Sequence, residues 1–493
     1  MKILKNCFVS ALLTATVTTA TAGGILTNTN QSIDFLRNPA RDAAIGLDGV
    51  YSNPAGVAFL PEGFHLGLNW QYAHQTRTVT STDANFALGR KNNGQTSKVF
   101  EGVADAPVIP SIQAAWNKGN WSMQFNFSVP GGGGKCEFAE GLGSFERVVG
   151  GIAAMLRDNG LGATGYDMNS MMTGRQYYYG IQLGTAYKVS ESLSVYGGLR
   201  LLYGDATYRA RISNIQVATT LADGQQAYVD FGSYLEATVA TINQQKQQGQ
   251  QALAAGLITA EEAQAALAKA DGAIQRLNML QKYSEGVNLL CNQTGLGIAP
   301  IIGIDYKIGN FNLAAKYEFK TQIRMTNEST VFEASEIDAV NKYKDGEKVN
   351  EDAPALLTVG AQWSPIESLR LNLGYHHYFD KQATWYNNSQ DKLDHNTNEF
   401  LAGAEWDVTD RFTVSAGGQM TRYGLTDQYM NDMSFVVNSI SYGFGCNYKV
   451  SDKVKVKVAY FQTDYDNYNR VSPTQDNFTR TNRVLGLGCD IDF

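Results

Sequence analysis

The last ten residues of the chain, VLGLGCDIDF at 484–493, alternate strictly between two kinds of side chain. Leu485, Leu487, Cys489, Ile491 and Phe493 form one apolar set, and after Val484 the other set consists of glycine and aspartate. Because successive side chains of a strand point to opposite faces, such a strand separates water from an apolar medium. A terminal aromatic residue, Phe493, fits the aromatic girdle of a transmembrane β-barrel. A half-buried strand of a soluble sheet would also alternate, so the recurrence of the pattern decides between the two.

The same alternation recurs in segments close to the ~9 to 11 residues that a tilted membrane strand needs. Fourteen such segments lie at about 64–72, 110–116, 121–129, 179–183, 193–201, 298–306, 311–319, 357–363, 369–375, 400–406, 412–420, 440–448, 454–460 and 484–493. Short and long connections alternate between them, as periplasmic turns and external loops do in outer-membrane barrels. A soluble β-sandwich or propeller has no reason to show that rhythm. We therefore predict an all-β fold, a 14-stranded antiparallel transmembrane β-barrel over residues 64–493.

Composition and inward charges support this prediction. The chain has 49 glycines, 26 tyrosines and 22 phenylalanines against 10 prolines, which favours curved strands with aromatic belts. Lys453, Lys455 and Lys457 alternate along one segment, and each would cost roughly 2 to 4 kcal/mol at the membrane midplane. These lysines are therefore expected to line a wet interior, near Asp490 and Asp492 of the last segment.

The N-terminus predicts export. Residues 1–22 are typical of a secretory signal peptide, because two lysines precede an apolar stretch and Ala20-Thr21-Ala22 fits a cleavage site. The sequence contains no run of ~18 apolar residues that would form a transmembrane helix. A net charge of −7 argues against nucleic acid as a partner. We expect a monomeric, multi-pass protein of the bacterial outer membrane that is surrounded by outer-membrane lipid.

Two of the long external connections, at about 130–173 and 211–290, are expected to contain helices. In the second, Thr259 and Glu262 fit a capping box ahead of residues with helical spacing. The first holds apolar residues at helical spacing, which are Phe145, Val148, Val149, Ile152, Met155 and Leu156. Together the two connections would form an apolar entrance that captures a ligand. For the second connection, the alternative is a solvated hairpin that only caps the barrel mouth.

The cysteines are few. Cys136 and Cys291 fall in the two helical connections, and an oxidising compartment would permit a disulfide between them. Cys446 and Cys489 fall on the outward faces of segments that are not neighbours, so both are expected to be unpaired.

Residues 23–63 hold too few large apolar groups to fold alone, and a segment of this size fits inside a barrel as a plug. The segment contains Gln31-Ser32, Ala43-Ala44-Ile45, Asp48 and then Asn53-Pro54-Ala55-Gly56 before the first strand. This order resembles the N-terminal hatch of the FadL family, outer-membrane transporters of long-chain fatty acids and aromatic hydrocarbons. The resemblance implies a barrel plugged by this hatch and a gating role for Asn53, Pro54, Ala55 and Gly56.

Some features depart from the family pattern. The tripeptide also occurs at Asn38-Pro39-Ala40, and residues 34–37 replace the glycine-rich arginine segment that commonly precedes the motif. In the family, the tripeptide lies near a break in the third strand through which ligand leaves sideways. Here the segment at 121–129 has no internal breaker, and Pro130 and Gly131 come only at its end. This argues against lateral exit, although lateral and periplasmic routes both stay open.

The sequence offers no catalytic constellation. The histidines lack metal-ligand spacing, and the adjacent His376 and His377 would face opposite sides of a strand. We predict no enzyme activity, no metal and no cofactor, and passive uptake of hydrophobic small molecules instead. Inward charges are either head-group ligands or mutually paired lumen charges, and the candidates are Arg200, Lys316, Arg370 and Lys453. The rival functions are a general or hydrophilic-solute porin and an adhesin or structural barrel.

Overall fold

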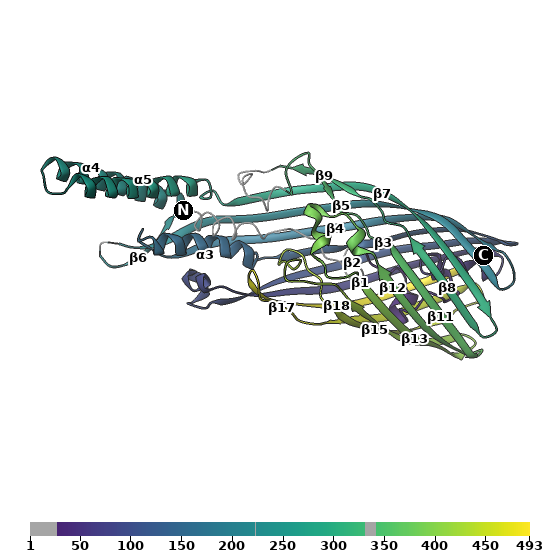
Figure 1. The fold of residues 1–493 in the computed structure, drawn as a ribbon. Helices are drawn as coiled ribbons and strands as arrows, with labels where there is room; N and C mark the ends of the chain where they lie inside the picture. The colour runs from purple at the N-terminus through teal and green to yellow at the C-terminus, as the bar shows by residue number, and fades with distance from the viewer. Residues whose placement is uncertain (1–26, 222, 331–341) are drawn as a thin grey trace.

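The computed structural model describes residues 27–221, 223–330 and 342–493. The expected signal peptide at 1–22 lies outside these residues. Within them, eighteen strands form one antiparallel sheet, and four of the strands are short. The remaining fourteen close into a barrel, because β1 pairs with both β2 and β18 (Figure 1). The predicted fold class and strand number are confirmed.

The barrel strands match the fourteen predicted segments in order, with residues 319 and 493 just beyond the ends of their strands. They are β1 (Gly63–Thr82), β2 (Ser97–Lys118), β3 (Trp121–Phe138), β4 (Ala163–Lys188), β5 (Leu193–Thr220), β7 (Val287–Ile308), β8 (Phe311–Glu318), β11 (Leu356–Ile366), β12 (Leu369–Tyr378), β13 (Asn398–Thr409), β14 (Phe412–Arg422), β15 (Ser439–Lys449), β16 (Val454–Tyr465) and β18 (Gln475–Asp492). The four short strands are β6 (Gln226–Asp230), β9 (Arg324–Ser329), β10 (Lys348–Asn350) and β17 (Tyr468–Arg470). Several barrel strands are far longer than predicted, and β5 has 28 residues.

Alternate residues of the strands form an apolar outer belt and a polar inner face. On β1, for example, Leu68 and Trp70 are exposed on the outside while Asn69 is buried inside. Lys457 contacts Asp490 at 2.6 Å, as predicted, whereas the carboxylate of Asp492 contacts a histidine instead. This belt is that of a β-barrel embedded in an outer membrane.

The helices lie in the hatch and in the connections. They are α2 (Ile33–Arg37), α3 (Gly143–Asp158), α4 (Phe231–Ala254) and α5 (Ala260–Gln281), with short 3₁₀ turns η1 (Leu47–Val50), η2 (Gly56–Phe59), η3 (Ala84–Leu88), η4 (Arg90–Asn92), η5 (Asp380–Gln382) and η6 (Tyr386–Lys392). The predicted capping box of Thr259 and Glu262 begins α5. The α4–α5 hairpin projects well beyond the ends of the strands (Figure 1). Among the described helices, none is long and apolar enough to cross a membrane.

The helical connections pack on one another. Val149, Ile152 and Leu156 of α3 are buried in one apolar cluster with Phe231 of α4 and Leu277 of α5. Residues of β4 and β5 complete this cluster. The apolar face of α3 is therefore covered by the protein itself.

The expected disulfide between Cys136 and Cys291 is not formed. Both cysteines are free, and they lie on β3 and β7 rather than in loops. The register places Gly174 and Tyr208 between them in one row across β4 and β5. Three interstrand steps of ~4.8 Å separate the two by about 14 Å along the wall, and a disulfide needs Cα atoms within ~6.8 Å. Cys446 and Cys489, which were expected to be unpaired, are also free.

Candidate functional site

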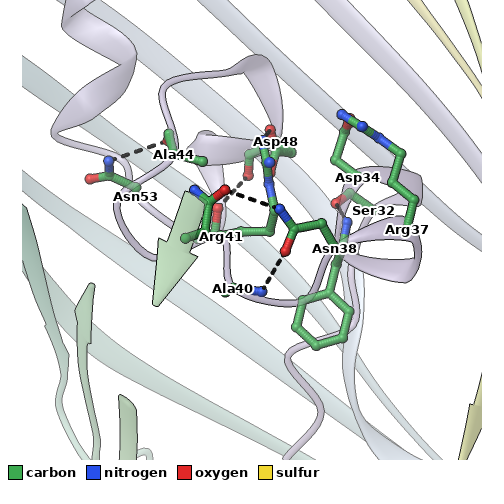
Figure 2. A network of polar contacts seen from close by, with 12 residues as sticks. Ser32, Asp34, Arg37, Asn38, Ala40, Arg41, Ala44, Asp48 and Asn53 are labelled. Carbon is green, nitrogen blue, oxygen red and sulfur yellow. Dashed lines mark hydrogen bonds and ion pairs between the residues drawn. The ribbon is translucent and has the colours of Figure 1, made fainter. Parts of the chain in front are cut away.

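Residues 27–63, which we call the hatch, lie inside the barrel with most side chains buried. Two Asn-Pro-Ala tripeptides form its turns. Asn53 Oδ1 accepts a hydrogen bond from the backbone N–H of Gly56 at 3.2 Å. Asn38 Oδ1 accepts one from the N–H of Ala40 at 3.3 Å (Figure 2). The repeated tripeptide, whose role the sequence left open, is thus a second turn stabilised by its own asparagine.

Each tripeptide also attaches the hatch to the wall. Asn53 Nδ2 donates to Asp305 on β7 at 2.6 Å, and Asn38 Nδ2 donates to Asn372 on β12 at 3.2 Å. The carbonyls of Pro54 and Ala55 accept hydrogen bonds from Gln124 on β3 and Ser194 on β5, at 2.8 and 2.6 Å. The expected gating residues are therefore bonded to three different strands.

A buried carboxylate, Glu405 of β13, links the hatch to the wall by ion pairs. It accepts from Arg41 at 2.5 Å, from Arg37 at 3.1 Å and from Arg370 of β12 at 3.3 Å. Arg41 also binds Asp48 with two nitrogens, at 2.8 and 2.9 Å (Figure 2). Removing a single member of this group would leave a buried charge without its full set of partners.

The network continues to the other side of the lumen through Asp34 of α2. Asp34 pairs with Arg37 at 2.8 Å and with Lys457 of β16 at 2.5 Å. Burial alone would raise the pKa of Asp34, but Lys457 and Arg37 outweigh it and hold the pKa well below its ordinary value. The carboxylate is therefore charged at every physiological pH.

A third contact joins Asp42 of the hatch to His376 of β12. The imidazole lies between Asp42 and Glu399 of β13, at 2.9 Å from each. Gly374 makes the approach possible, since a Cβ there would lie 2.2 Å from an oxygen of Asp42. The neighbouring His377 bonds to Asn398 on the outer side, so the two histidines face opposite sides as predicted.

Glycines of the wall give the hatch its room. A Cβ on Gly443 of β15 would lie 1.8 Å from the backbone oxygen of Leu36, and one on Gly403 of β13 would lie 2.0 Å from Asn38 Oδ1. Approach this close leaves no room for a side chain at either position. Some of the glycines that we took as a sign of curved strands therefore allow the hatch to pack against the wall.

The wall is interrupted between β2 and β3. The ladder runs up to Ile112 opposite Phe127 and resumes only at Val103 opposite Glu137, which leaves residues 104–111 unpaired with β3. The prediction for the third strand was wrong here, because β3 continues to residue 138 and encloses the breakers at 130–134. Its pairing with β4 also shifts register at these residues. Proline and glycine in both strands explain the lost pairing, since proline has no N–H to donate.

Gln31 of the hatch fills this gap from inside. Its side chain accepts from the N–H of Val129 at 3.1 Å and donates to the carbonyl of Val129 at 3.2 Å. Its backbone oxygen accepts from Ser111 and Gln113 of β2, at 2.6 and 3.2 Å. One glutamine therefore stands in for ladder bonds that the two strands do not make with each other.

A cavity of about 70 Å³ lies above the hatch, beside the gap. Its lining includes Phe35 of the hatch and Ile109 of β2, which belongs to the unpaired stretch. Further apolar lining comes from Phe461 and Val484, and polar lining from residues such as Gln75. Ligand pockets commonly measure ~300 to 1,000 Å³, so a bound molecule would require the hatch or the wall to move.

The candidate head-group residues are already paired. Arg200 bonds to Glu318 and Gln182, and Lys316 lies 2.7 Å from Glu318. Arg370 binds Asp407 at 2.7 Å in addition to Glu405. The placement of the fourth was wrong: Lys453 lies exposed in the turn directly before β16, and not on the inner face of the strand. The paired-charge alternative describes the first three.

The candidate capture residues divide into two groups. Val149, Ile152 and Leu156 are buried, whereas Phe145, Val148 and Met155 are only partly buried at the edge of the same cluster. No group of three or more His, Cys, Asp or Glu residues suited to a metal ion occurs in the described parts of the chain.

The fold and the site together define a class, a transmembrane β-barrel of fourteen strands that an N-terminal hatch closes from within. No protein-family model matches the chain, and no curated protein matches its sequence. Solved structures do resemble it. A FadL homologue of Pseudomonas aeruginosa matches with a TM-score of 0.58 at 11% identity, over 96% of this chain and 100% of that one.

Two further solved structures agree. The toluene transporter TodX of P. putida matches with a TM-score of 0.50 at 12% identity, over 91% of this chain and 94% of that one. A TodX deltaS2S3 mutant, a monoaromatic hydrocarbon channel, gives 0.53 at 13% identity, over 94% and 100%. The chain thus has the FadL-type fold that its hatch residues predicted.

Proposed function

We propose that this protein is a passive outer-membrane uptake channel for hydrophobic small molecules. The observation that carries the proposal is the interrupted wall between β2 and β3, which Gln31 of the hatch covers from inside. A route of this kind leads from an internal cavity directly into the apolar layer of the membrane. Neighbours of the same fold are a toluene transporter and a monoaromatic hydrocarbon channel.

The hatch is the element that we propose moves. It is held by hydrogen bonds of Asn53, Pro54 and Ala55 and by ion pairs, so its movement requires that these contacts with the wall are released. Burial of an alkyl chain at ~0.8 kcal/mol per CH₂ supplies the free energy for binding without a coupled energy source. A ligand in the cavity would then displace Gln31 and leave through the gap, and a periplasmic exit past Gly56 is the competing route.

Capture would begin at the outer helices. Phe145, Val148 and Met155 form the partly exposed edge of the cluster between α3 and the α4–α5 hairpin. Because the rest of that face is buried, we propose that a ligand enters along this edge when the helices separate. The filled lumen weighs against a general porin, since the cavity above the hatch measures about 70 Å³.

The test is a reversible lock across the gap. Thr27 and Gly131 form an isolated antiparallel bridge between the hatch and β3, and bridged residues lie ~4.5 to 5.5 Å apart at Cα. A Thr27→Cys, Gly131→Cys double variant can therefore form a disulfide of ordinary geometry. Uptake of a labelled fatty acid and of labelled toluene is measured in cells, in the oxidised and the reduced state.

We expect uptake to fall to the level of cells lacking the protein when the lock is oxidised and to recover after reduction. The single-cysteine variants serve as controls for the redox treatment. A Gln31→Ala variant is expected to raise uptake, because the gap loses its internal cover. Equal uptake in the locked and reduced states would refute passage through the gap, and passage of sugars at the same rate would favour a porin.

A further inference from the structure

The outer face of the wall turns from apolar to basic where the strands leave the membrane. On β5, the exposed Tyr203 is the last aromatic residue of the outer face, and the exposed Arg209 and Arg211 follow on the same face. On β4, Arg175 lies just beyond Tyr177. Aromatic girdles mark the interfaces of a membrane barrel, so the three arginines lie at the level of the lipid head groups and above it.

Two further cations continue this face on the adjoining strands. Thr326 of β9 pairs with Thr294 of β7, so the exposed Arg324 lies level with Leu296 at the edge of the apolar belt. Lys348 of β10 is exposed and pairs with Thr326, which makes it a diagonal neighbour of Arg324. The strands β4, β5, β7, β9 and β10 pair in this order (Figure 1). We call Arg175, Arg209, Arg211, Arg324 and Lys348 the basic face.

The protein itself does not neutralise the basic face. Four of its five members form no ion pair within the described residues, and Arg175 alone is bound, to Asp205 at 2.8 Å. Of the other carboxylates on these strand faces, Glu137 is bound to Lys135 and Glu328 is exposed. Arginines of the lumen such as Arg41, by contrast, bind internal carboxylates. The basic face therefore presents its charge to what lies outside the wall.

The outward charge of another part of the wall has the opposite sign. Glu101 and Asp105 of β2 and Asp464 of β16 are exposed on the outer face, and Arg483 of β18 is the isolated cation among them. The whole chain has a net charge of −7. Because an acidic protein carries its unneutralised outward cations mainly on adjoining strands, charge complementarity favours an anionic partner at that place.

We propose that the basic face binds the phosphate groups of a phosphorylated glycolipid in the outer leaflet of the outer membrane. The inference goes beyond the uptake function and does not depend on it. A guanidinium group matches a phosphate with two parallel hydrogen bonds, and a lysine adds a point charge. Arg209 and Arg211 lie about 7 Å apart on one face of the strand, so one anion between them would also relieve their mutual repulsion.

The height of the basic face distinguishes a glycolipid from a glycerophospholipid. From Tyr203 to Arg211 the strand advances eight residues, or about 26 Å. At a tilt of about 40°, Arg211 stands about 20 Å above the girdle. The head-group region of a leaflet is only about 5 to 8 Å thick. A single phosphate at the interface therefore reaches Arg324 or Lys348 at most, whereas a sugar head group that carries phosphates further out also reaches Arg209 and Arg211.

The test is a binding measurement with three lipids. Full-length protein in neutral detergent, freed of co-purified lipid, is titrated with a rough lipopolysaccharide that has a phosphorylated core, and bound lipid is counted by native mass spectrometry. The other two probes are the same lipopolysaccharide after dephosphorylation, and phosphatidylglycerol. EDTA is present throughout, so that divalent cations do not bridge the lipid to carboxylates of the protein.

The variants divide the basic face by height. One carries Arg209→Gln and Arg211→Gln, a second carries Arg324→Gln and Lys348→Gln, and a third carries all four changes. The matched control carries Arg422→Gln and Arg483→Gln, two arginines on the outer faces of β14 and β18.

We expect the unaltered protein to bind the phosphorylated lipopolysaccharide at least tenfold more tightly than the dephosphorylated form. Each exposed ion pair is weak alone, so each double variant should lose about threefold to fivefold in affinity and the fourfold variant at least tenfold. The control should stay within twofold. All variants should keep the unfolding temperature of the unaltered protein, because the exchanged side chains are at the surface.

Three results would overturn the proposal. The first is an undiminished preference for the phosphorylated form in the fourfold variant, and the second is an equal loss of affinity in the control. The third is binding of phosphatidylglycerol as tight as that of lipopolysaccharide, together with no effect of the Arg209→Gln, Arg211→Gln pair. That third result would show a general anionic-lipid contact at the interface in place of a glycolipid site.

Discussion

Replacing Glu405 by Gln should make the barrel permeable to ions and small hydrophilic molecules. The carboxylate accepts from Arg37 and Arg41 of the hatch and from Arg370 of the wall, and the isosteric amide keeps the shape but removes the charge. Removing one partner of a buried ion pair costs about 3 to 5 kcal/mol. Because Arg37 and Arg41 keep their other carboxylate partners, Asp34 and Asp48, we expect the lower end of that range.

About 3 kcal/mol corresponds to roughly a hundredfold increase in the population with a displaced hatch, at about 1.4 kcal/mol for each factor of ten. The assay is channel conductance in planar bilayers, supported by the sensitivity of cells to a hydrophilic antibiotic. Asp407→Asn is the matched control, since Asp407 binds Arg370 on the same strand pair but touches no described hatch residue. The reasoning would be refuted if the Glu405→Gln barrel had no higher conductance than the unaltered one. Equal conductance of the Asp407→Asn control and the Glu405→Gln variant would also refute it.

Three further predictions concern packing, pH and the thiols. Gly443→Ala should displace the hatch and raise conductance, because its Cβ would lie 1.8 Å from a hatch carbonyl oxygen. Gly197→Ala is the control and should leave conductance unchanged, because no atom lies within 4 Å of a Cβ at that position. Burial raises the pKa of Asp380 to about 6, so its loop is most stable when the carboxyl is protonated and loses that stability as the pH rises through 6. Asp380→Asn should therefore raise the unfolding temperature at pH 7.5 and leave it unchanged at pH 4. The corresponding gain in unfolding free energy at pH 7.5 is up to about 3 kcal/mol. Under non-reducing denaturation, Cys136 and Cys291 should both react with a maleimide, and a mass lower by two hydrogens with no labelling would contradict the register.

The strand number and the inward faces could be predicted because both depend on local alternation. Phe311 and Leu313 are outward and Asn312 is inward for reasons that lie within ten residues of sequence. Strand length was underestimated, because the outer extensions reverse the alternation of the membrane segments. On β5, Tyr208 and Ala210 are buried inside whereas Arg209 is exposed on the outside. Cys136 and Cys291 were assigned to loops for the same reason.

The parts of the site that were missed depend on tertiary register. The gap between β2 and β3 exists only because broken stretches of two strands lie beside each other, and Gln31 reaches it from a distant part of the chain. The pairing of Asp42 with His376 likewise joins residues more than three hundred positions apart.

The length of β5 has a consequence for how a water-insoluble compound arrives. Its 28 residues extend about 90 Å at ~3.3 Å per residue. With a tilt near ~40°, this strand rises about 70 Å, of which the apolar band takes only about 25 Å. β5 thus extends roughly 45 Å above the lipid on one side, with the α4–α5 hairpin beyond it (Figure 1). Under the proposed uptake function, a hydrophobic molecule would meet the protein at the outer ends of these strands, far from the apolar band. The protein would then shorten the aqueous distance that such a molecule must cross on its own.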